Sequence, residues 1–344
     1  MKKILFFGEL APNIIHGISL ANRLNIDLLS KKYFLDIVEE KSELKEHNKR
    51  TSSKIIKIWS YIKEIYNLNK KKKYDFFYTI FSLSTFGSIK TLFSILSFKM
   101  SNKRKVVIHI HRGDFEIFYN KNLLNKYIVK IIFKLIDKLI VLSENQKIQF
   151  SEHLDISKIF ILENSLIEEF QMVDGEKEEQ FIYISNYIKE KGIFELLEVF
   201  SNDKNLSLKC FGGFVNNEDE IRKYESKNIK ISSFINGKEK FQEIDKSQAL
   251  ILPSWNEGQP TVILEAMMMG TIVITTKVGL IEELLGEDYP FYFKAKNQKS
   301  LKECINRFQR YENKDELSYK LRQIYKSKYS KEIHQQKLLK IFGE

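Results

Sequence analysis

Two carboxylates eight positions apart, Glu257 and Glu265, flank a predicted helix start. The N–H groups at such a start are unpaired and lie at the positive end of the helix dipole, so they favour a phosphate. A carboxylate on either side can accept paired hydrogen bonds from vicinal hydroxyls, as the acid of dinucleotide folds does with ribose. The spacing therefore predicts a sugar nucleotide, bound as hexose, diphosphate and ribose in that order. The donor-binding residues of the turn itself are Gly258, Gln259, Pro260, Thr261 and Val262.

The elements around this turn follow from residue types in the surrounding stretch. The apolar run at residues 249–252 has the length of a buried parallel strand, and residues 272–275 form a second, β-branched one. Pro260 stands where a helix begins, because its missing N–H would be unpaired there anyway. Gly270 ends the helix predicted over residues 261–269. A strand–loop–helix–strand unit of this kind places its ligand at the carboxyl ends of its strands.

The stretch PSWNEGQPTVILEAMMMG, residues 253–270, resembles the retaining glycosyltransferases of family 4. The resemblance rests on the Glu-x7-Glu spacing together with the Pro-Ser turn, the Glu-Ala pair in the helix and the closing Gly. It implies an α/β protein with the GT-B fold, in which two Rossmann-like, doubly wound domains face a cleft. It also implies that Glu257 contacts the donor sugar and Glu265 the donor ribose. Taken singly, Glu257 would also fit a solvated loop charge, and Glu265 a charge that complements the helix dipole.

Residues in the first half match ligand-facing segments of the same family. By this resemblance Gly17 faces the donor phosphates and His16 the acceptor, although His16 fits a surface loop equally well. His111 is assigned to the cleft beneath the donor sugar, near the reacting hydroxyl, and Asp114 to the acceptor. Alternation along the preceding strand places His109 on the same side as His111, and we expect His109 to be a core histidine.

A lysine before another predicted helix matches the family's diphosphate clamp in part. Lys191 and Gly192 correspond to its Lys-Gly pair, and a lysine at a helix start is unfavourable for the dipole, which favours a functional role. Where the family has Arg, this chain has Asn186, which cannot supply the charge. Lys189 is a candidate for the missing cation. Ile235 lies in a turn that the family places against the nucleotide base, so it is a donor contact through its backbone.

The length of 344 residues exceeds what one hydrophobic core usually serves, and βα alternation occurs twice. We expect an acceptor-side domain over residues 1–165 and a nucleotide-sugar domain over 166–325. The resemblance adds a helix within 326–344 that packs back on the first domain.

The two cysteines, Cys210 and Cys304, have no ligand-spaced His or Cys neighbours, which favours a reducing compartment without disulfides or zinc. Since the chain has no Asp-x-Asp pair, we expect no metal and no cofactor besides the donor substrate.

Positive charge is concentrated in the first half of the chain. Residues 1–165 hold 29 Lys and Arg against 16 Asp and Glu, while the whole chain has a net charge of +11. Such a bias favours an anionic partner, and the absence of a nucleic-acid-binding signature favours a membrane surface or lipid diphosphate. A lysine-rich proteome would give the same bias. The basic region over 41–73 would lie on anionic lipid or form an ordinary solvated helix.

No segment of the sequence is interpreted as a membrane span or signal peptide. The most apolar window, residues 76–98, carries Lys90 and many Ser and Thr, so it is interpreted as strand, loop and helix. The apolar run at the start of the chain is too short for a signal peptide and is predicted to be the first strand.

Together these features predict metal-independent, retaining transfer of a hexose from a nucleotide-diphosphate sugar to an acceptor hydroxyl. We expect a glycan or lipid-linked glycan acceptor in bacterial surface polysaccharide synthesis, and a cytoplasmic protein peripheral to the inner face of the cell membrane. Two alternatives stay open: a non-catalytic anion- or membrane-docking protein, and a sugar-nucleotide epimerase of GT-B architecture. Slow release of free sugar from the donor would separate a transferase from a docking protein, and an epimer formed without acceptor would indicate the epimerase.

Overall fold

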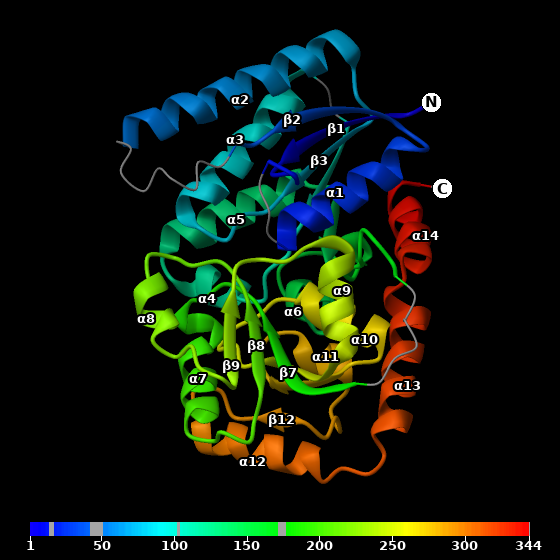
Figure 1. The fold of residues 1–344 in the computed structure, drawn as a ribbon. Helices are drawn as coiled ribbons and strands as arrows, with labels where there is room; N and C mark the ends of the chain where they lie inside the picture. The colour runs from blue at the N-terminus through cyan, green and yellow to red at the C-terminus, as the bar shows by residue number, and fades with distance from the viewer. Residues whose placement is uncertain (14–16, 42–50, 102–103, 171–176, 344) are drawn as a thin grey trace. The chain divides into compact units, whose positions relative to one another are not determined.

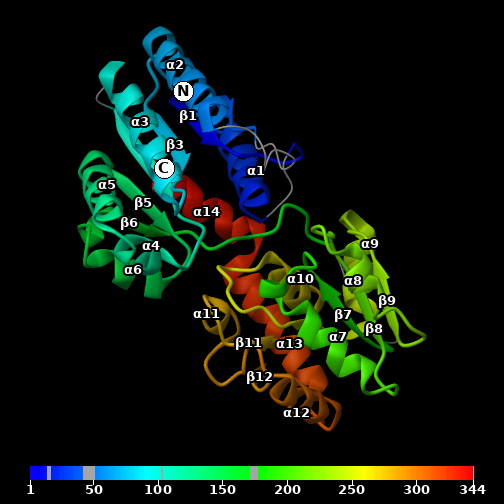
Figure 2. The same cartoon turned by 90° about the vertical axis from the view of Figure 1, so that its left-hand side faces the viewer.

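The computed structural model describes residues 1–13, 17–41, 51–101, 104–170 and 177–343, with the backbone alone at 51–54 and 101. The chain divides into two compact units, which Figures 1 and 2 show from two directions. The first consists of Met1–Ile167 with His334–Glu344, and the second of Glu168–Ile333.

The chain returns to the first unit at His334, whereas the sequence predicted a boundary at 326. The intervening residues stay with the second unit because Glu169 holds them there. Its carboxylate accepts hydrogen bonds from the Tyr325 hydroxyl and from the backbone N–H of Lys331, both at 2.9 Å.

A parallel six-stranded sheet forms the first unit, in the order β2-β1-β3-β4-β5-β6. Its strands are β1 (Lys3–Gly8), β2 (Phe34–Glu39), β3 (Phe76–Ile80), β4 (Lys105–His109), β5 (Lys138–Val141) and β6 (Ile159–Ile161). Its helices are α1 (Gly17–Ser30), α2 (Thr51–Lys72), α3 (Thr85–Ser101), α4 (Phe115–Asn120), α5 (Leu123–Leu135), α6 (Glu144–Ser151) and the C-terminal α14 (Lys331–Phe342). Since the strands are parallel, the loops that follow them lie at one edge of the sheet.

Helices cover both faces of this sheet, because strand residues alternate between two apolar cores. In β1, Leu5 and Phe7 belong to one core, and Ile4 and Phe6 to the other. The first core includes residues of α2, α3 and α5, namely Ile65, Ile95, Phe98 and Val129. The second includes residues of α1 and α14, namely Leu24, Leu28, Leu338 and Phe342. The C-terminal helix is therefore part of the core of the first unit.

The second unit repeats this plan with the strand order β12-β11-β10-β7-β8-β9. Its strands are β7 (Glu178–Ile184), β8 (Leu208–Phe211), β9 (Ile229–Ser232), β10 (Ser247–Leu252), β11 (Ile272–Thr276) and β12 (Tyr292–Phe293). Its helices are α7 (Ile193–Ser201), α8 (Glu218–Arg222), α9 (Gly237–Lys246), α10 (Thr261–Met269), α11 (Ile281–Leu285), α12 (Gln298–Gln309) and α13 (Lys314–Ile324). The strand order reverses between β7 and β10, and ligands of such sheets bind beyond the carboxyl ends at that point.

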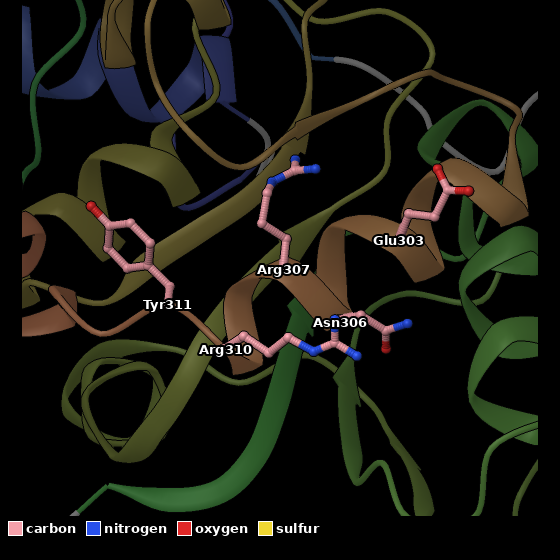
Figure 3. Close-up of a pocket in the computed structure, with 5 residues that line it drawn as sticks. All are labelled: Glu303, Asn306, Arg307, Arg310 and Tyr311. Carbon is pink, nitrogen blue, oxygen red and sulfur yellow. The ribbon is translucent and has the colours of Figure 1, made fainter.

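A depression on the second unit lies along α12 and the residues after it (Figure 3). It is lined by Glu303, Asn306, Arg307, Arg310 and Tyr311. The Arg307 guanidinium is fixed by the backbone oxygens of Pro290 and Tyr292, at 3.0 and 3.1 Å. No site residue predicted from the sequence lines this depression.

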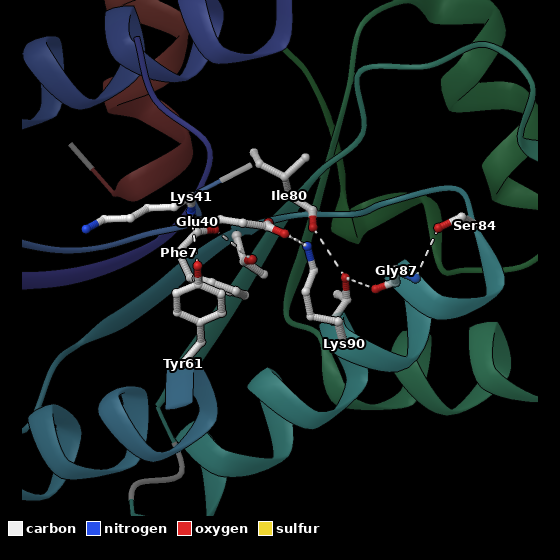
Figure 4. Close-up of polar contacts among 10 residues, drawn as sticks. Phe7, Glu40, Lys41, Tyr61, Ile80, Ser84, Gly87 and Lys90 are labelled. Atoms are coloured by element: carbon white, nitrogen blue, oxygen red, sulfur yellow. Dashed lines mark hydrogen bonds and ion pairs between the residues drawn. The ribbon is translucent and has the colours of Figure 1, made fainter. Parts of the chain in front are cut away.

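Helix α3 begins at Thr85, within the stretch 76–98 that is interpreted from the sequence as strand, loop and helix. Ser84 provides the reason, because its hydroxyl oxygen accepts a hydrogen bond from the backbone N–H of Gly87 at 3.0 Å and so satisfies a free donor of the first turn. One turn later, Lys90 forms an ion pair with Glu40, which follows β2 (Figure 4). Among the described helices, none has the length and apolar character needed to cross a bilayer.

Candidate active site

The loop between β10 and α10 is held in place from both sides by closely packed backbone. Gly192 has φ +69°, and a Cβ there would lie 2.1 Å from the backbone oxygen of Pro253. Gly279 has φ +58°, and its Cβ would lie 1.8 Å from the backbone oxygen of Glu257. Only glycine permits either approach, since side chains rarely adopt these conformations and would overlap the neighbouring carbonyl. The loop is therefore packed closely against the segments that contain Gly192 and Gly279.

Glu257 and Lys191, predicted to act on the donor, are in direct contact. Lys191 Nζ lies 2.7 Å from Glu257 Oε1, and the Ser254 hydroxyl donates to the same oxygen at 2.6 Å. The Glu257 side chain is 8 % exposed and that of Lys191 is 25 % exposed. The description of Glu257 as a solvated loop charge is therefore wrong.

Glu265 lies inside α10 and forms an ion pair that sequence reasoning missed. Its Oε1 lies 2.6 Å from Nζ of Lys240 in α9, and both side chains are largely buried. Burial raises the pKa of Glu265, and the ion pair with Lys240 offsets only part of that rise. Glu265 is the fifth residue of the helix, so it lies beyond the first turn, where a negative charge would complement the helix dipole. Nothing in the sequence distinguishes Lys240 from the other lysines of α9.

The start of α10 lies between these two acids. Pro260 precedes the helix, and no side chain caps its first turn, which also contains no acidic residue. Thr261 and Val262 are half-buried, and Gln259 is buried. The positive end of the helix dipole lies beside Gly258 and the Glu257 carboxylate, which Lys191 and Ser254 hold in place. An anion would be stabilised there.

The remaining predicted donor residues of the second unit lie on neighbouring loops at the same edge of its sheet. Asn186 follows β7, and its backbone oxygen accepts the Tyr183 hydroxyl at 2.9 Å while its side chain is exposed. Ile235 follows β9 and is half-buried. Lys189, the candidate replacement cation, lies 5.7 Å from the ring centroid of Trp255. The structure thus places Lys189 over an aromatic ring beside the loop of Glu257.

In the first unit, His111 follows β4 and is buried. Its ring lies 3.8 Å, centroid to centroid, from that of His109. Asp114 precedes α4, and its carboxylate accepts a hydrogen bond from Arg112 Nε at 2.9 Å. Gly17 is exposed as the first residue of α1, and His16 lies outside the described residues.

A buried chain of hydrogen bonds joins His109 to the C-terminal helix, and sequence reasoning missed it. His109 Nδ1 lies 2.9 Å from the Tyr78 hydroxyl, which lies 2.9 Å from the Asn25 side-chain amide. Asn25 Oδ1 lies 2.6 Å from His334 Nε2, and His334 Nδ1 lies 2.8 Å from the backbone oxygen of Glu163. The bond between Asn25 and His334 spans 309 positions. His109 Nε2 has no hydrogen-bond partner among the described residues.

Burial lowers the pKa of His334 to about 4, so its ring is neutral at pH 7. Asn25 Nδ2 donates to the Tyr78 hydroxyl oxygen, and Asn25 Oδ1 lies beside His334 Nε2. The Tyr78 hydroxyl can in turn donate its proton to His109 Nδ1, and burial lowers the pKa of His109 as well.

Groups of three or more His, Cys, Asp or Glu side chains that could hold a metal ion are absent from the described part of the chain. The two free cysteines, Cys210 and Cys304, are both buried.

Part of the chain is similar to a known protein family. Residues 166–328 match the family model described as Glycosyl transferases group 1. A Bacillus subtilis protein named as a teichuronic acid biosynthesis glycosyltransferase, TuaC, is 28 % identical over 134 residues, which are 37 % of this chain and 32 % of that protein. The match thus spans about a third of the length of that relative.

Solved structures share the fold of the whole chain. Sucrose-phosphate synthase from Thermosynechococcus elongatus superposes with a TM-score of 0.80 at 12 % identity, covering 99 % of this chain and 98 % of that one. Anabaena Alr3699/HepE, described in complex with UDP and glucose, superposes with a TM-score of 0.74 at 14 % identity, covering 99 % of each chain. The chain therefore has the GT-B fold, and its residues 166–328 match the model of the group 1 glycosyl transferases.

Proposed function

We propose that the protein is a glycosyltransferase that moves a hexose from a nucleotide-diphosphate sugar to an acceptor hydroxyl. The observation that carries this proposal is the contact between Lys191 and Glu257 beside the start of α10. A diphosphate at the helix start would lie within reach of Lys191, and the pinned Glu257 carboxylate would accept hydrogen bonds from the sugar hydroxyls. The group 1 glycosyl transferase match to the same unit supports this reading.

The chemical task of this site is to stabilise charge on the leaving diphosphate. In the transfer the bond from the anomeric carbon to the diphosphate oxygen breaks, a bond to the acceptor oxygen forms, and the acceptor proton passes to the departing diphosphate, as the family resemblance implies. Lys191 and the free N–H groups of α10 would hold the developing negative charge, which is electrostatic stabilisation without a metal. Glu257 would orient the sugar and stabilise the electron-poor anomeric carbon.

Glu265 is proposed to hold the ribose of the donor, with Lys240 keeping its carboxylate available. A buried carboxylate without a partner would favour its neutral form, which accepts fewer hydrogen bonds. The ion pair with Lys240 opposes that tendency.

Several finer properties belong to the same proposal. Retention at the anomeric carbon and metal independence are carried from the family 4 resemblance and from the absence of an Asp-x-Asp pair. A lipid-linked glycan acceptor at the cytoplasmic membrane face is supported by the basic first half of the chain. The name of TuaC, which matches 37 % of this chain, supports a role in surface polysaccharide synthesis. His111 would lie near the reacting hydroxyl and Asp114 near the acceptor.

The test begins with thermal-shift screening of the purified protein against UDP-, GDP- and ADP-sugars. With the donor found, Glu257→Gln and Lys191→Ala should each lower turnover by about a hundredfold or more, because each removes charge at the site of charge development. Released nucleoside diphosphate measures donor breakdown, and NMR of the product gives the anomeric configuration.

A matched control is available on the same unit. Lys209 and Glu243 form an ion pair at 2.9 Å with comparable burial, away from the α10 loop. Lys209→Ala and Glu243→Gln should leave turnover unchanged. Wild-type turnover in Glu257→Gln and Lys191→Ala would reject the proposed roles.

A further inference from the structure

Three neighbouring helices of the first unit expose an apolar outer surface. Helices α2, α3 and α5 pack on one face of the sheet, and α3 contacts both of the others (Figure 2). Ten large apolar side chains on these helices are more than a third exposed. They are Ile55, Ile56 and Trp59 of α2, Phe86, Phe93, Leu96 and Met100 of α3, and Leu123, Leu124 and Tyr127 of α5. We call these ten residues, with the lysines of the three helices, the α2–α3–α5 surface.

This exposure distinguishes the first unit from the second. Among the described residues of the second unit, large apolar side chains with comparable exposure are Val215, Phe234 and Tyr319. Single exposed apolar residues are ordinary on a soluble protein, whereas a contiguous group marks a contact with something apolar. The α2–α3–α5 surface is such a group.

The surface is continuous across the helices. The rings of Trp59 and Phe93 lie 6.3 Å apart, centroid to centroid, and join α2 to α3. Beneath the surface, the Thr85 hydroxyl donates to the buried side-chain oxygen of Asn125 at 2.9 Å, so the starts of α3 and α5 lie side by side. On α3, the exposed residues recur at spacings of three, four and seven, which place them on one stripe of the helix.

The helices that carry this surface are rich in lysine. They contain eleven lysines and a single acidic residue, Glu64. Three of the lysines form ion pairs with acids of neighbouring segments, namely Lys72, Lys90 and Lys99. Lys63 and Lys70 share the outer stripe of α2 with Trp59, and Lys130 is exposed on α5 with Tyr127. Trp, Tyr and Lys are the side chains that suit a membrane–water interface, because each combines an apolar body with a polar or charged end.

We infer that the α2–α3–α5 surface docks the protein onto an anionic lipid bilayer. The apolar residues would enter the interface while the lysines meet the lipid headgroups. A second copy of the same surface is disfavoured, because the exposed lysines of one copy would face those of the other. Nucleic acid would use the lysines but would leave the exposed aliphatic side chains unpaired with anything apolar. The inference deepens the proposed membrane-face acceptor and rests on that proposal for its biological purpose, but its physical basis is independent of catalysis.

The first test is co-flotation of the full chain with vesicles. Phosphatidylcholine vesicles containing phosphatidylglycerol should bind the protein, and pure phosphatidylcholine vesicles should bind it at least about tenfold less. Trp59→Ser combined with Phe93→Ser should reduce binding by about tenfold or more, and so should Lys63→Glu combined with Lys130→Glu. Val215→Ser combined with Tyr319→Ser, on the second unit, is the matched control and should bind as wild type.

The two tryptophans of the chain report on the contact directly, because Trp59 lies in the first unit and Trp255 in the second. In Trp255→Phe, the remaining Trp59 emission should shift to the blue on adding anionic vesicles. In Trp59→Phe, the remaining Trp255 emission should stay unchanged. No flotation, equal binding to neutral and anionic vesicles, or wild-type binding by both surface variants would overturn the inference.

Donor binding by the same variants keeps this inference separate from the proposed function. The surface variants should keep the wild-type thermal shift with the donor sugar nucleotide, which also shows that they fold. If flotation persists while no sugar nucleotide binds, the membrane-docking inference holds and the transferase proposal fails. A dimer in vesicle-free solution that is lost in the Trp59→Ser, Phe93→Ser variant would instead identify a second copy as the occupant and overturn the inference.

Discussion

Gly279→Ala tests whether close backbone packing holds the Glu257 loop. The added Cβ would lie 1.8 Å from the Glu257 backbone oxygen, whereas real Cβ contacts are essentially never under 3.0 Å. The two segments must therefore separate by more than about 1 Å. Gly237→Ala is a matched control, because Gly237 has φ +57° against +58° for Gly279 but a Cβ there meets nothing within 4 Å.

The two variants share the cost of a left-handed alanine, about 1 kcal/mol. Gly279→Ala should additionally weaken the bond from the Leu280 N–H to the Gly258 oxygen and the bonds that Lys191 and Ser254 make to Glu257. A neutral hydrogen bond contributes roughly 1 kcal/mol and a bond to a charged group roughly 1.5–3 kcal/mol. We therefore expect Gly279→Ala to lower the free energy of unfolding of the second unit by about 2–4 kcal/mol more than Gly237→Ala.

Urea unfolding in a Trp59→Phe background measures this difference, because Trp255 is then the only tryptophan and lies in the loop itself. Circular dichroism on the same samples separates global unfolding from local opening. Equal destabilisation of the two variants, within about 0.5 kcal/mol, would refute the argument that the carbonyl contact fixes the loop.

Three further predictions concern buried polar groups. Because the pKa of His334 is lowered to about 4, the unfolded chain binds more protons between about pH 6.5 and 4, so the first unit should lose stability as the pH falls through that window. Urea midpoints reported by Trp59 in a Trp255→Phe background check this, and a flat profile would contradict it. Tyr78 accepts from Asn25 Nδ2 and can donate to His109 Nδ1, so NMR of imidazole ¹⁵N shifts at pH 7 should find the His109 proton on Nε2, and Tyr78→Phe should remove that preference; a proton on Nδ1 in the wild type would contradict this direction. Lys240→Met should leave Glu265 buried without a counter-charge, raise its pKa further and weaken donor binding, as calorimetry across pH would measure; wild-type affinity at all pH values would contradict the role of the pair.

The sequence by itself determined the local frame of the candidate site. Pro260 and Gly270 bound α10 as predicted, and the apolar and β-branched runs on either side form β10 and β11. These assignments succeeded because they depend on residue conformation and periodicity within a few positions of the chain. Parallel topology then places the loops after these strands at one edge of the sheet, which needs no knowledge of the contacts themselves.

Only the tertiary structure decided which charges meet. Lys191 and Glu257 are 66 positions apart, and nothing in the sequence predicted that these two would pair. Lys240 becomes the partner of Glu265, and His334 joins the core of the first unit, because distant elements pack side by side. Contacts of this kind depend on how helices and strands pack, and local sequence patterns do not encode which distant side chain completes a buried polar group.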